Sequence, residues 1–170
     1  MTHDTQPIPR RDITHDDIAR ALAAPSGKAP SLPTDEQLRV LDAPFAPTLV
    51  MAGAGSGKTH TMTGRILSLI VREGQEPASI LGLTFTRKAA GELRARVRSG
   101  IASVRRAGLL DEGTLEMPEI TTYNSYANAV YRDNALVIGV EPDATLLDEA
   151  SAWMLMRSII RDSTDDRLLD

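Results

Sequence analysis

The chain has 170 residues and no cysteine, and 42% of its residues are apolar, which suits a globular core and excludes disulfides and thiolate metal sites. Its formal net charge of −4 gives no general attraction for nucleic acid, so a nucleic-acid partner requires a local basic patch. No apolar run approaches the roughly 20 residues of a membrane span, and the N-terminus lacks a secretory signal pattern, so we expect a soluble cytoplasmic protein with no membrane contact.

Two capping boxes predict short helices near the N-terminus, after a polar tail. The first box opens at Thr14 and predicts a helix through about Ala24. Residues 25–33 contain several prolines and predict a linker. The second box pairs Thr34 with Gln37 and opens another short helix.

Strand and helix patterns alternate through the middle of the chain. Short apolar runs predict buried strands at residues 48–51, 80–85 and 119–122. Apolar residues at helical spacing predict helices over residues 62–72 and 88–104, between these strands. Such alternation is typical of an α/β fold in which crossover helices flank a parallel sheet.

Two helices in succession are predicted after the last strand, over residues 124–138 and 147–161. No strand pattern separates them, which indicates that the chain has left the sheet for a helical subdomain. The sequence therefore predicts three parts: an N-terminal tail and short helix (1–32), an α/β domain (33–126) and the start of a helical subdomain (127–170).

A glycine-rich loop joins the first predicted strand to the helix that follows it. It consists of Ala52, Gly53, Ala54, Gly55, Ser56, Gly57, Lys58 and Thr59. Glycines allow backbone N–H groups to converge on a phosphate, and the dipole of the following helix favours the anion. In such a loop Lys58 reaches the β- and γ-phosphates of ATP, and the Thr59 hydroxyl binds Mg²⁺. Ala52 stands where the P-loop pattern has glycine, and its backbone tolerates that position at negative φ.

The phosphate loop alone leaves the class of enzyme open, because kinases, GTPases and helicases all carry one, and a turn without a ligand is the plain alternative. Three further segments resemble motifs of the UvrD/Rep/PcrA family of superfamily 1 DNA helicases. Gln37 stands at the family's Q motif, which implies that its amide, donor and acceptor at once, binds the adenine edge. The alternative is a glutamine that only caps its helix. The same resemblance places His60 beside the nucleotide, where relatives often carry arginine.

Residues 83–90 resemble motif Ia of this family and follow the second predicted strand. Open α/β sheets bind ligands at this end of their strands. The resemblance implies that the loop contacts single-stranded DNA, with Phe85 as a stacking platform, Thr86 as a donor to phosphate and Arg87 as an added positive charge. The alternative for Phe85 is a place in the core.

Residues 121–126 resemble motif Ib, with Tyr123 in place of the usual phenylalanine and Asn124 in place of histidine. The resemblance implies that Thr122, Tyr123, Asn124 and Ser125 contact DNA. The alternative is a strand-to-helix turn that Asn124 or Ser125 caps.

The predicted helix between these two motifs is strongly basic. Residues 87–106 contain seven lysines and arginines against one acid, Glu92. A solvated helix face explains such a run, and so does a flank that follows the phosphate charges of DNA.

The family resemblance implies the N-terminal part of a RecA-like helicase domain, 1A, which runs into a helical 1B subdomain. The whole protein is then expected to be an ATP-dependent DNA helicase or translocase that moves 3′ to 5′ and acts in repair or recombination. Details such as residues 139–143 resemble actinobacterial members, including subunits of AdnAB-type helicase–nuclease machines. That finer resemblance implies a helicase–nuclease partner subunit.

The Asp-Glu pair that holds Mg²⁺ and activates water in this family does not occur here at the end of an apolar strand. Asp148 and Glu149 follow two leucines, but the pattern there predicts the first turn of a helix. We therefore expect the 170 residues to bind ATP weakly without useful hydrolysis. A non-catalytic ATP-binding module stays open as an alternative, as does a small-molecule P-loop kinase, in which motifs Ia and Ib would have no role.

Overall fold

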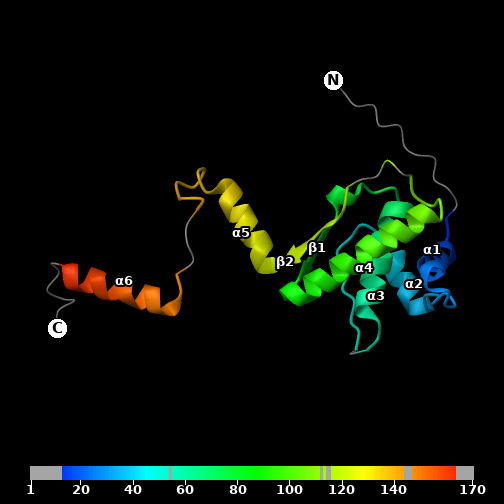
Figure 1. Cartoon of the computed structure of the whole chain (residues 1–170), viewed down its shortest axis with the longest axis horizontal. Coiled ribbons are helices and arrows are strands. Elements are labelled where there is room, and N and C mark those ends of the chain that lie inside the picture. Colours follow the sequence, from blue (N-terminus) through cyan, green and yellow to red (C-terminus); the bar gives the residue numbers. More distant parts are fainter. Residues whose placement is uncertain (1–12, 54, 112, 114–115, 144–146, 164–170) are drawn as a thin grey trace, which may run out of the picture. The chain divides into compact units, whose positions relative to one another are not determined.

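The structure is a computed structural model that describes residues 13–53, 55–111, 113, 116–143 and 147–163. The chain divides into two compact units, Met1–Tyr126 and Ala127–Asp170. The elements of the first unit are α1 (His15–Ala23), the 3₁₀ turn η1 (Ala24–Ser26), α2 (Asp35–Leu41), α3 (Lys58–Val71), the 3₁₀ turn η2 (Pro77–Ser79), β1 (Leu81–Thr84), α4 (Arg87–Arg106) and β2 (Glu119–Thr122) (Figure 1). Helix α5 (Tyr123–Asn134) follows β2 and continues into the second unit, which also contains α6 (Glu149–Asp162).

Capping side chains begin the first two helices, as the sequence predicts. The Thr14 hydroxyl accepts a hydrogen bond from the Asp17 backbone N–H at 3.1 Å, and the Asp17 carboxylate accepts one from the Thr14 N–H at 2.9 Å. Thr34 and Gln37 form the same reciprocal pair at 3.3 and 3.1 Å. Each box satisfies two backbone donors that a helix start leaves without a partner, and a cap of this kind contributes about 1 kcal/mol.

Helix α4 carries the core of the first unit on one face. Leu93, Val97 and Ile101 recur every four residues and are at most 2% exposed, which confirms the inner face expected from helical spacing. They pack with buried residues of the neighbouring elements: Ile18 and Ala21 of α1, Ile66, Leu67 and Ile70 of α3, and Ile120 of β2. Full burial of a large apolar side chain contributes roughly 1.5–3 kcal/mol, so this cluster holds three helices and a strand in one unit.

Strands β1 and β2 form a parallel pair in which Thr84 lies opposite Thr122. Both strands were predicted, and α4 is the crossover helix that a parallel connection requires. Because both strands end at the same edge, the residues that follow them, Phe85 and Tyr123, start from neighbouring positions. The sheet therefore brings together two segments that lie far apart in the sequence.

The strand predicted at residues 48–51 is not formed, and this prediction was wrong. These residues lie within the described part of the chain, have no strand hydrogen bonds, and leave Leu49 and Met51 87% and 89% exposed. An extended segment becomes a strand only when a neighbour pairs with its backbone, and the sheet of the described residues contains β1 and β2 alone. The described fold is thus a mixed helix and sheet unit with a small parallel sheet.

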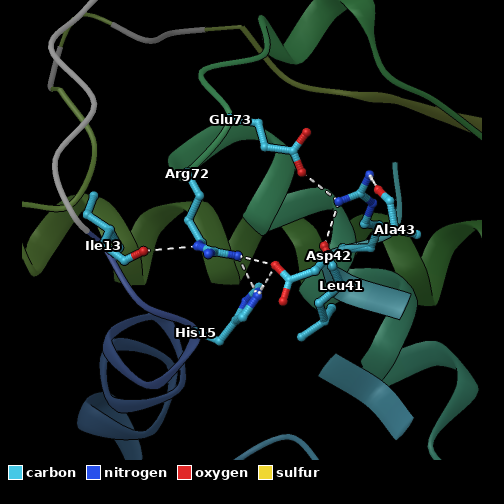
Figure 2. A network of polar contacts seen from close by, with 8 residues as sticks. Ile13, His15, Leu41, Asp42, Ala43, Arg72 and Glu73 are labelled. Carbon is cyan, nitrogen blue, oxygen red and sulfur yellow. Dashed lines mark hydrogen bonds and ion pairs between the residues drawn. The ribbon is translucent and has the colours of Figure 1, made fainter. Parts of the chain in front are cut away.

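A polar network joins the first turn of α1 to the ends of α2 and α3 (Figure 2). Asp42 Oδ1 accepts a hydrogen bond from Arg72 Nη1 at 2.6 Å and lies 2.8 Å from His15 Nε2. Arg72 Nε also donates to the Ile13 carbonyl at 2.9 Å. Burial raises the pKa of Asp42, but the hydrogen bonds and charges of Arg72 and His15 outweigh it and hold that pKa below its ordinary value of 3.8.

A second arginine fixes the turn that follows α2. Arg65 Nη2 donates to the Ala43 carbonyl at 2.6 Å, and its Nη1 donates to the Leu41 carbonyl at 2.5 Å and to the Glu73 carboxylate at 2.6 Å. Figure 2 shows these three acceptors converging beside the Asp42 network. The planar guanidinium satisfies several acceptors at once, so it holds the end of α2 against α3.

Helix α5 ends at Asn134, earlier than the predicted end at residue 138. The Val140 N–H donates to the Ala135 carbonyl at 2.9 Å, and Gly139 has a φ of 73°, in the left-handed region. A left-handed glycine closes a turn after a helix at little steric cost. The apolar pattern continues past Asn134, but the backbone hydrogen bonds of the helix do not, so the predicted end was wrong.

Helix α6 begins at a capping side chain and exposes apolar residues. The Asp148 carboxylate accepts a hydrogen bond from the Ser151 N–H at 2.7 Å, which confirms that it belongs to the start of a helix. Hydrogen bonding by the Ser151 side chain, and then by this N–H, lowers the pKa of Asp148. Trp153 and Ile159 are 56% and 61% exposed. Among the described helices, none has both the length and the apolar character needed to cross a membrane.

Candidate functional site

The glycine-rich loop leads directly into α3. Gly55 and Gly57 have φ values of 79° and 83°, a region that side chains disfavour, so both positions require glycine. Ala52 has a negative φ, like every non-glycine residue in the described part of the chain, so alanine fits there as predicted. Ala54, also assigned to the loop, lies outside the described residues.

The side chains of the loop are exposed, and Lys58 lies across it. The Lys58 ammonium group donates to the carbonyls of Ala52 at 2.9 Å and Gly53 at 3.0 Å. The Ser56 hydroxyl donates to the same Gly53 carbonyl at 2.8 Å and tightens the turn. Thr59 follows in the exposed first turn of α3, where no acidic residue competes with an anion. The loop thus presents a cation and the start of a helix to solvent.

Gln37 lies beside this loop. A Cβ atom added to Gly57 would lie 3.4 Å from Gln37 Nε2. Gln37 Oε1 accepts the capping hydrogen bond from the Thr34 N–H at 3.1 Å, while no described residue accepts a hydrogen bond from its Nε2. The two interpretations of Gln37 are therefore compatible, because the cap occupies one lone pair and leaves the amide donors available.

A cavity of about 230 Å³ opens next to Gln37 within the first unit. Gln37, His60 and Thr61 line it on the side of α2 and α3. Residues of α1 and of the linker after it form the rest of the wall, among them Ala19, Ala23 and Lys28. Two predicted nucleotide residues, Gln37 and His60, thus share one cavity.

Phe85 and Tyr123 form an aromatic pair at the edge where both strands end. Their ring centroids are 5.2 Å apart with an interplanar angle of 36°, and the two residues are 89% and 49% exposed. The alternative in which Phe85 belongs to the core is therefore wrong. An exposed aromatic pair leaves a large apolar area in water, which is unusual unless another molecule covers it.

The residues around this pair begin helices α4 and α5. The Thr86 hydroxyl accepts a hydrogen bond from the Ala89 N–H at 3.1 Å and is the N-cap of α4. The Thr122 hydroxyl accepts from the Ser125 N–H at 3.1 Å and donates to the Ser125 hydroxyl at 2.9 Å. The cap of α5 is therefore Thr122, whereas the sequence suggested Asn124 or Ser125.

The reason for this difference lies in where α5 starts. The helix begins at Tyr123, directly after β2, so the residue before it takes the capping position. Thr122 is 7% exposed, while Asn124 and Ser125 are exposed beside Tyr123. Thr122 thus positions the exposed residues of this turn.

Two basic residues, Arg87 and Lys88, occupy the exposed first turn of α4 next to Phe85. Positive side chains at a helix start oppose the helix dipole by a few tenths of a kcal/mol or more, so local stability does not explain them. Arg94, farther along α4, instead donates to the Ile120 carbonyl of β2 and has a structural role. The basic run of α4 therefore combines a structural arginine with a positive group beside the aromatic pair.

The sequence pattern of the UvrD/REP helicase N-terminal domain matches residues 33–170. The chain belongs to the UvrD/Rep helicase family. DNA helicase II of Haemophilus influenzae is 35% identical over 127 residues, which cover 75% of this chain and 17% of that protein. ATP-dependent DNA helicase PcrA of Leuconostoc citreum is 34% identical over 75% of this chain and 16% of its own length, and PcrA of Staphylococcus aureus Mu50 is 30% identical over 77% and 17%. The chain spans about a sixth of the length of these curated relatives.

Membership of the UvrD/Rep family confirms the resemblance found in the sequence. The exposed loop beside Gln37 and the exposed Phe85–Tyr123 pair both lie in the region that matches this family. The matched region contains Gln37, the phosphate loop and both segments of the aromatic pair. It does not contain α1, whose residues line the cavity beside Gln37. Sequence reasoning missed this wall of the cavity, because α1 precedes every motif. The pattern that could have indicated it is the small pair Ala19 and Ala23, four residues apart on one helix face.

The candidate metal ligand near the phosphate loop suits a magnesium ion that is bound mainly by a nucleotide. Among the described residues, no three His, Asp or Glu side chains gather as a metal site. Mg²⁺ in nucleotide sites is usually held by one or two protein groups together with phosphate oxygens and water. The single exposed hydroxyl of Thr59 at the start of α3 matches that donor set.

Proposed function

We propose that this chain supplies one half of the ATP site and part of the single-stranded DNA path of a UvrD-type DNA helicase. The observation that carries the proposal is the exposed Phe85–Tyr123 pair, in the same unit as a phosphate loop. A small-molecule kinase with such a loop has no use for two solvent-exposed aromatic rings at a sheet edge. Membership of a DNA helicase family supports the same conclusion.

In the proposed ATP site, the phosphates lie against the loop and the start of α3. Lys58 exchanges its carbonyl partners for the β- and γ-phosphates, and Thr59 contributes its hydroxyl to Mg²⁺, which neutralises phosphate charge when bound. Gln37 and His60, which share the cavity beside the loop, contact the base. The remaining loop residues, Gly53 to Gly57 after Ala52, provide backbone N–H groups.

In the proposed DNA path, Phe85 and Tyr123 stack on bases and the positive residues at the start of α4 bind the backbone. Stacking on an aromatic ring contributes about 1–3 kcal/mol per base and does not depend on sequence. Arg87, and the hydroxyl proton of Thr86, are the phosphate donors nearest the rings. Asn124 and Ser125 complete this surface on α5, and Thr122 holds their turn in place.

For the whole protein, we propose ATP-dependent movement along DNA in the 3′ to 5′ direction, in repair or recombination, by analogy with the family. Residues 33–126 would belong to a RecA-like domain and residues 127–170 to a helical subdomain. The 170 residues alone would bind ATP weakly and hydrolyse it little, because Asp148 caps α6 and neither strand of the described residues ends in an acidic pair. The relatives described above are named as helicases, and their names give no support for a nuclease partner.

The DNA half of this proposal is tested with Phe85→Ala. The affinity for a single-stranded oligothymidylate, measured by fluorescence anisotropy, should fall roughly 5- to 150-fold, the equivalent of one lost stacking contact. Phe45→Ala is the matched control, because Phe45 is exposed too, at 72%, but lies in the segment between α2 and the phosphate loop. It should leave the DNA affinity unchanged. Equal affinities for wild type and Phe85→Ala would sink the stacking role.

A further inference from the structure

One face of α1 forms a wall of the cavity beside Gln37. The cavity-lining residues of α1 and η1 are spaced three or four apart, as one helix face requires: His15, Ile18, Ala19, Leu22, Ala23 and Ser26. Ile18 and Leu22 also pack against the core of the first unit, whereas Ala19 and Ala23 are absent from that cluster. Ala19 is 8% exposed, and both alanines add only a methyl group to the wall, so neither side chain extends far into the space in front of it.

This wall is fixed in place. Ile18 and Ala21 belong to the core cluster, and Gly100 of α4 lets the helices approach so closely that an added Cβ would lie 2.8 Å from Leu67 and 3.4 Å from Leu22. At the other end of α1, the network around Asp42 ties its first turn to α2 and α3, as Figure 2 shows. Contacts at both ends of α1 therefore anchor this side of the cavity to the rest of the first unit.

The size and position of the cavity suit a nucleobase. Pockets that enclose whole drug-sized ligands measure about 300–1,000 Å³, whereas this one measures about 230 Å³. It adjoins the phosphate loop, since Gln37 both lines it and lies next to Gly57. Apolar groups of Ile18 and Leu22 offer contact to a ring face, and the Gln37 amide offers hydrogen bonds to its edge. The Ser26 hydroxyl donates its proton to the Ala23 carbonyl at 2.9 Å, so it can only accept from the base.

We propose that residues 15–31, which precede the region shared with the helicase family, form the outer wall of the pocket that holds the base of ATP. The inference rests on the proposed ATP site and adds a base-recognition element outside the family match, which begins at residue 33. Small residues at Ala19 and Ala23 leave room for the purine. The N-terminal segment therefore contributes to the preference for a nucleotide over phosphate alone.

The test measures the contribution of the base to ATP affinity separately from that of the phosphates. Ala23→Phe places a ring inside the cavity, and the affinities of the chain for ATP and for tripolyphosphate are measured by calorimetry in the presence of Mg²⁺. We expect the ATP affinity to fall about tenfold or more, towards that of tripolyphosphate, while the tripolyphosphate affinity is unchanged. Ala95→Phe, on the exposed face of α4, is the matched control and should change neither affinity.

Each other outcome decides against one of the two proposals. Wild-type protein that binds neither ligand contradicts the proposed ATP site itself. Wild-type protein that binds ATP no more tightly than tripolyphosphate, or an Ala23→Phe variant with normal ATP affinity, overturns the wall and leaves the phosphate loop intact. If Ala23→Phe loses both ligands, the smaller change Ala23→Leu repeats the comparison, and loss of both ligands there also counts against the wall.

Discussion

Helices α1 and α3 lie in the same unit, yet they begin in different ways. The Thr14 side chain caps the start of α1 by accepting a hydrogen bond from the Asp17 N–H, and the Asp17 carboxylate accepts one from the Thr14 N–H. The start of α3 has no side-chain cap; the residue before it is Gly57, with a left-handed backbone. Helices α2, α4 and α6 also have side-chain caps.

This difference indicates which helix start can bind an anion. At a capped helix start a side chain satisfies one or two of the four free N–H groups, whereas an uncapped start offers all of them, with the positive end of the dipole, to an anion. At α3 the missing cap coincides with an exposed lysine and a loop that requires glycine. A stability loss at the capped start and a binding loss at the open one would establish the contrast experimentally.

Lys58→Ala tests the open start and should have the largest effect. A charged hydrogen bond contributes about 1.5–3 kcal/mol, so the affinity for Mg²⁺–ATP should fall roughly 10- to 150-fold in calorimetry. The free energy of unfolding should stay within about 0.5 kcal/mol of wild type, because the bonds of Lys58 to Ala52 and Gly53 are exposed. Lys88→Ala, at the capped start of α4, is the matched control and should leave ATP binding intact. An equal loss of ATP affinity in both variants would contradict the assignment.

Gly57→Ala sharpens the contrast by adding a Cβ atom where φ is 83°. A left-handed backbone costs a non-glycine residue about 1–2 kcal/mol, and we expect that loss in the free energy of unfolding by denaturant titration. ATP affinity should fall as well, because relief of the strain would reshape the loop. Gly53→Ala is the control, since Gly53 has no positive φ and an added Cβ there meets nothing within 4 Å. Equal stabilities for the two variants would argue against a strained loop.

Thr14→Ala removes the hydroxyl that caps the start of α1. Loss of the cap should lower the free energy of unfolding by about 1 kcal/mol, and Thr14→Ser should restore most of it, because serine caps equally well. Chemical denaturation followed by circular dichroism measures both variants. A Thr14→Ala variant as stable as wild type would show that the core contacts of α1, and not its cap, hold the helix.

The smallest expected effect concerns Asp42, which ties the start of α1 to α2 and α3. Its pKa in the folded protein is below 3.8, so its ion pairs stabilise the fold above that pH and are lost as the pH falls through the folded pKa. The stability difference between wild type and Asp42→Asn should therefore shrink on acidification from about pH 6 to about pH 3. Other carboxylates titrate in both proteins, so the difference isolates Asp42. A difference that grows on acidification would have the wrong sign for this network.

Local patterns predicted much of the fold. The capping boxes at Thr14 and Thr34, the inner face of α4 and the strand at residues 119–122 depend on residues close in sequence, and all were confirmed. The strand at residues 48–51 failed, because an apolar run does not reveal whether another strand will pair with it. The cap of α5 was placed on the wrong residue, because the helix begins immediately after β2.

The candidate site divides in the same way. The sequence located its glycine-rich loop, and the structure confirms left-handed glycines there at Gly55 and Gly57, while phosphate binding stays a prediction. The exposure of Phe85 could not be predicted, because the same aromatic at a strand end could equally have been buried. Nor could the wall of α1, whose alanines carry no chemistry and matter only through the space they leave beside Gln37.

The sequence by itself determined where the capped helices start, where the glycine-rich loop lies and which family the chain resembles, because these depend on residue types at fixed short spacings. Only the tertiary structure decided that Phe85 meets Tyr123, that Gln37 lies beside Gly57 and that α1 encloses the cavity next to both the loop and α2. These contacts join residues about 20 to 40 positions apart, and parallel strand pairing and core packing bring such residues together, not local backbone preference.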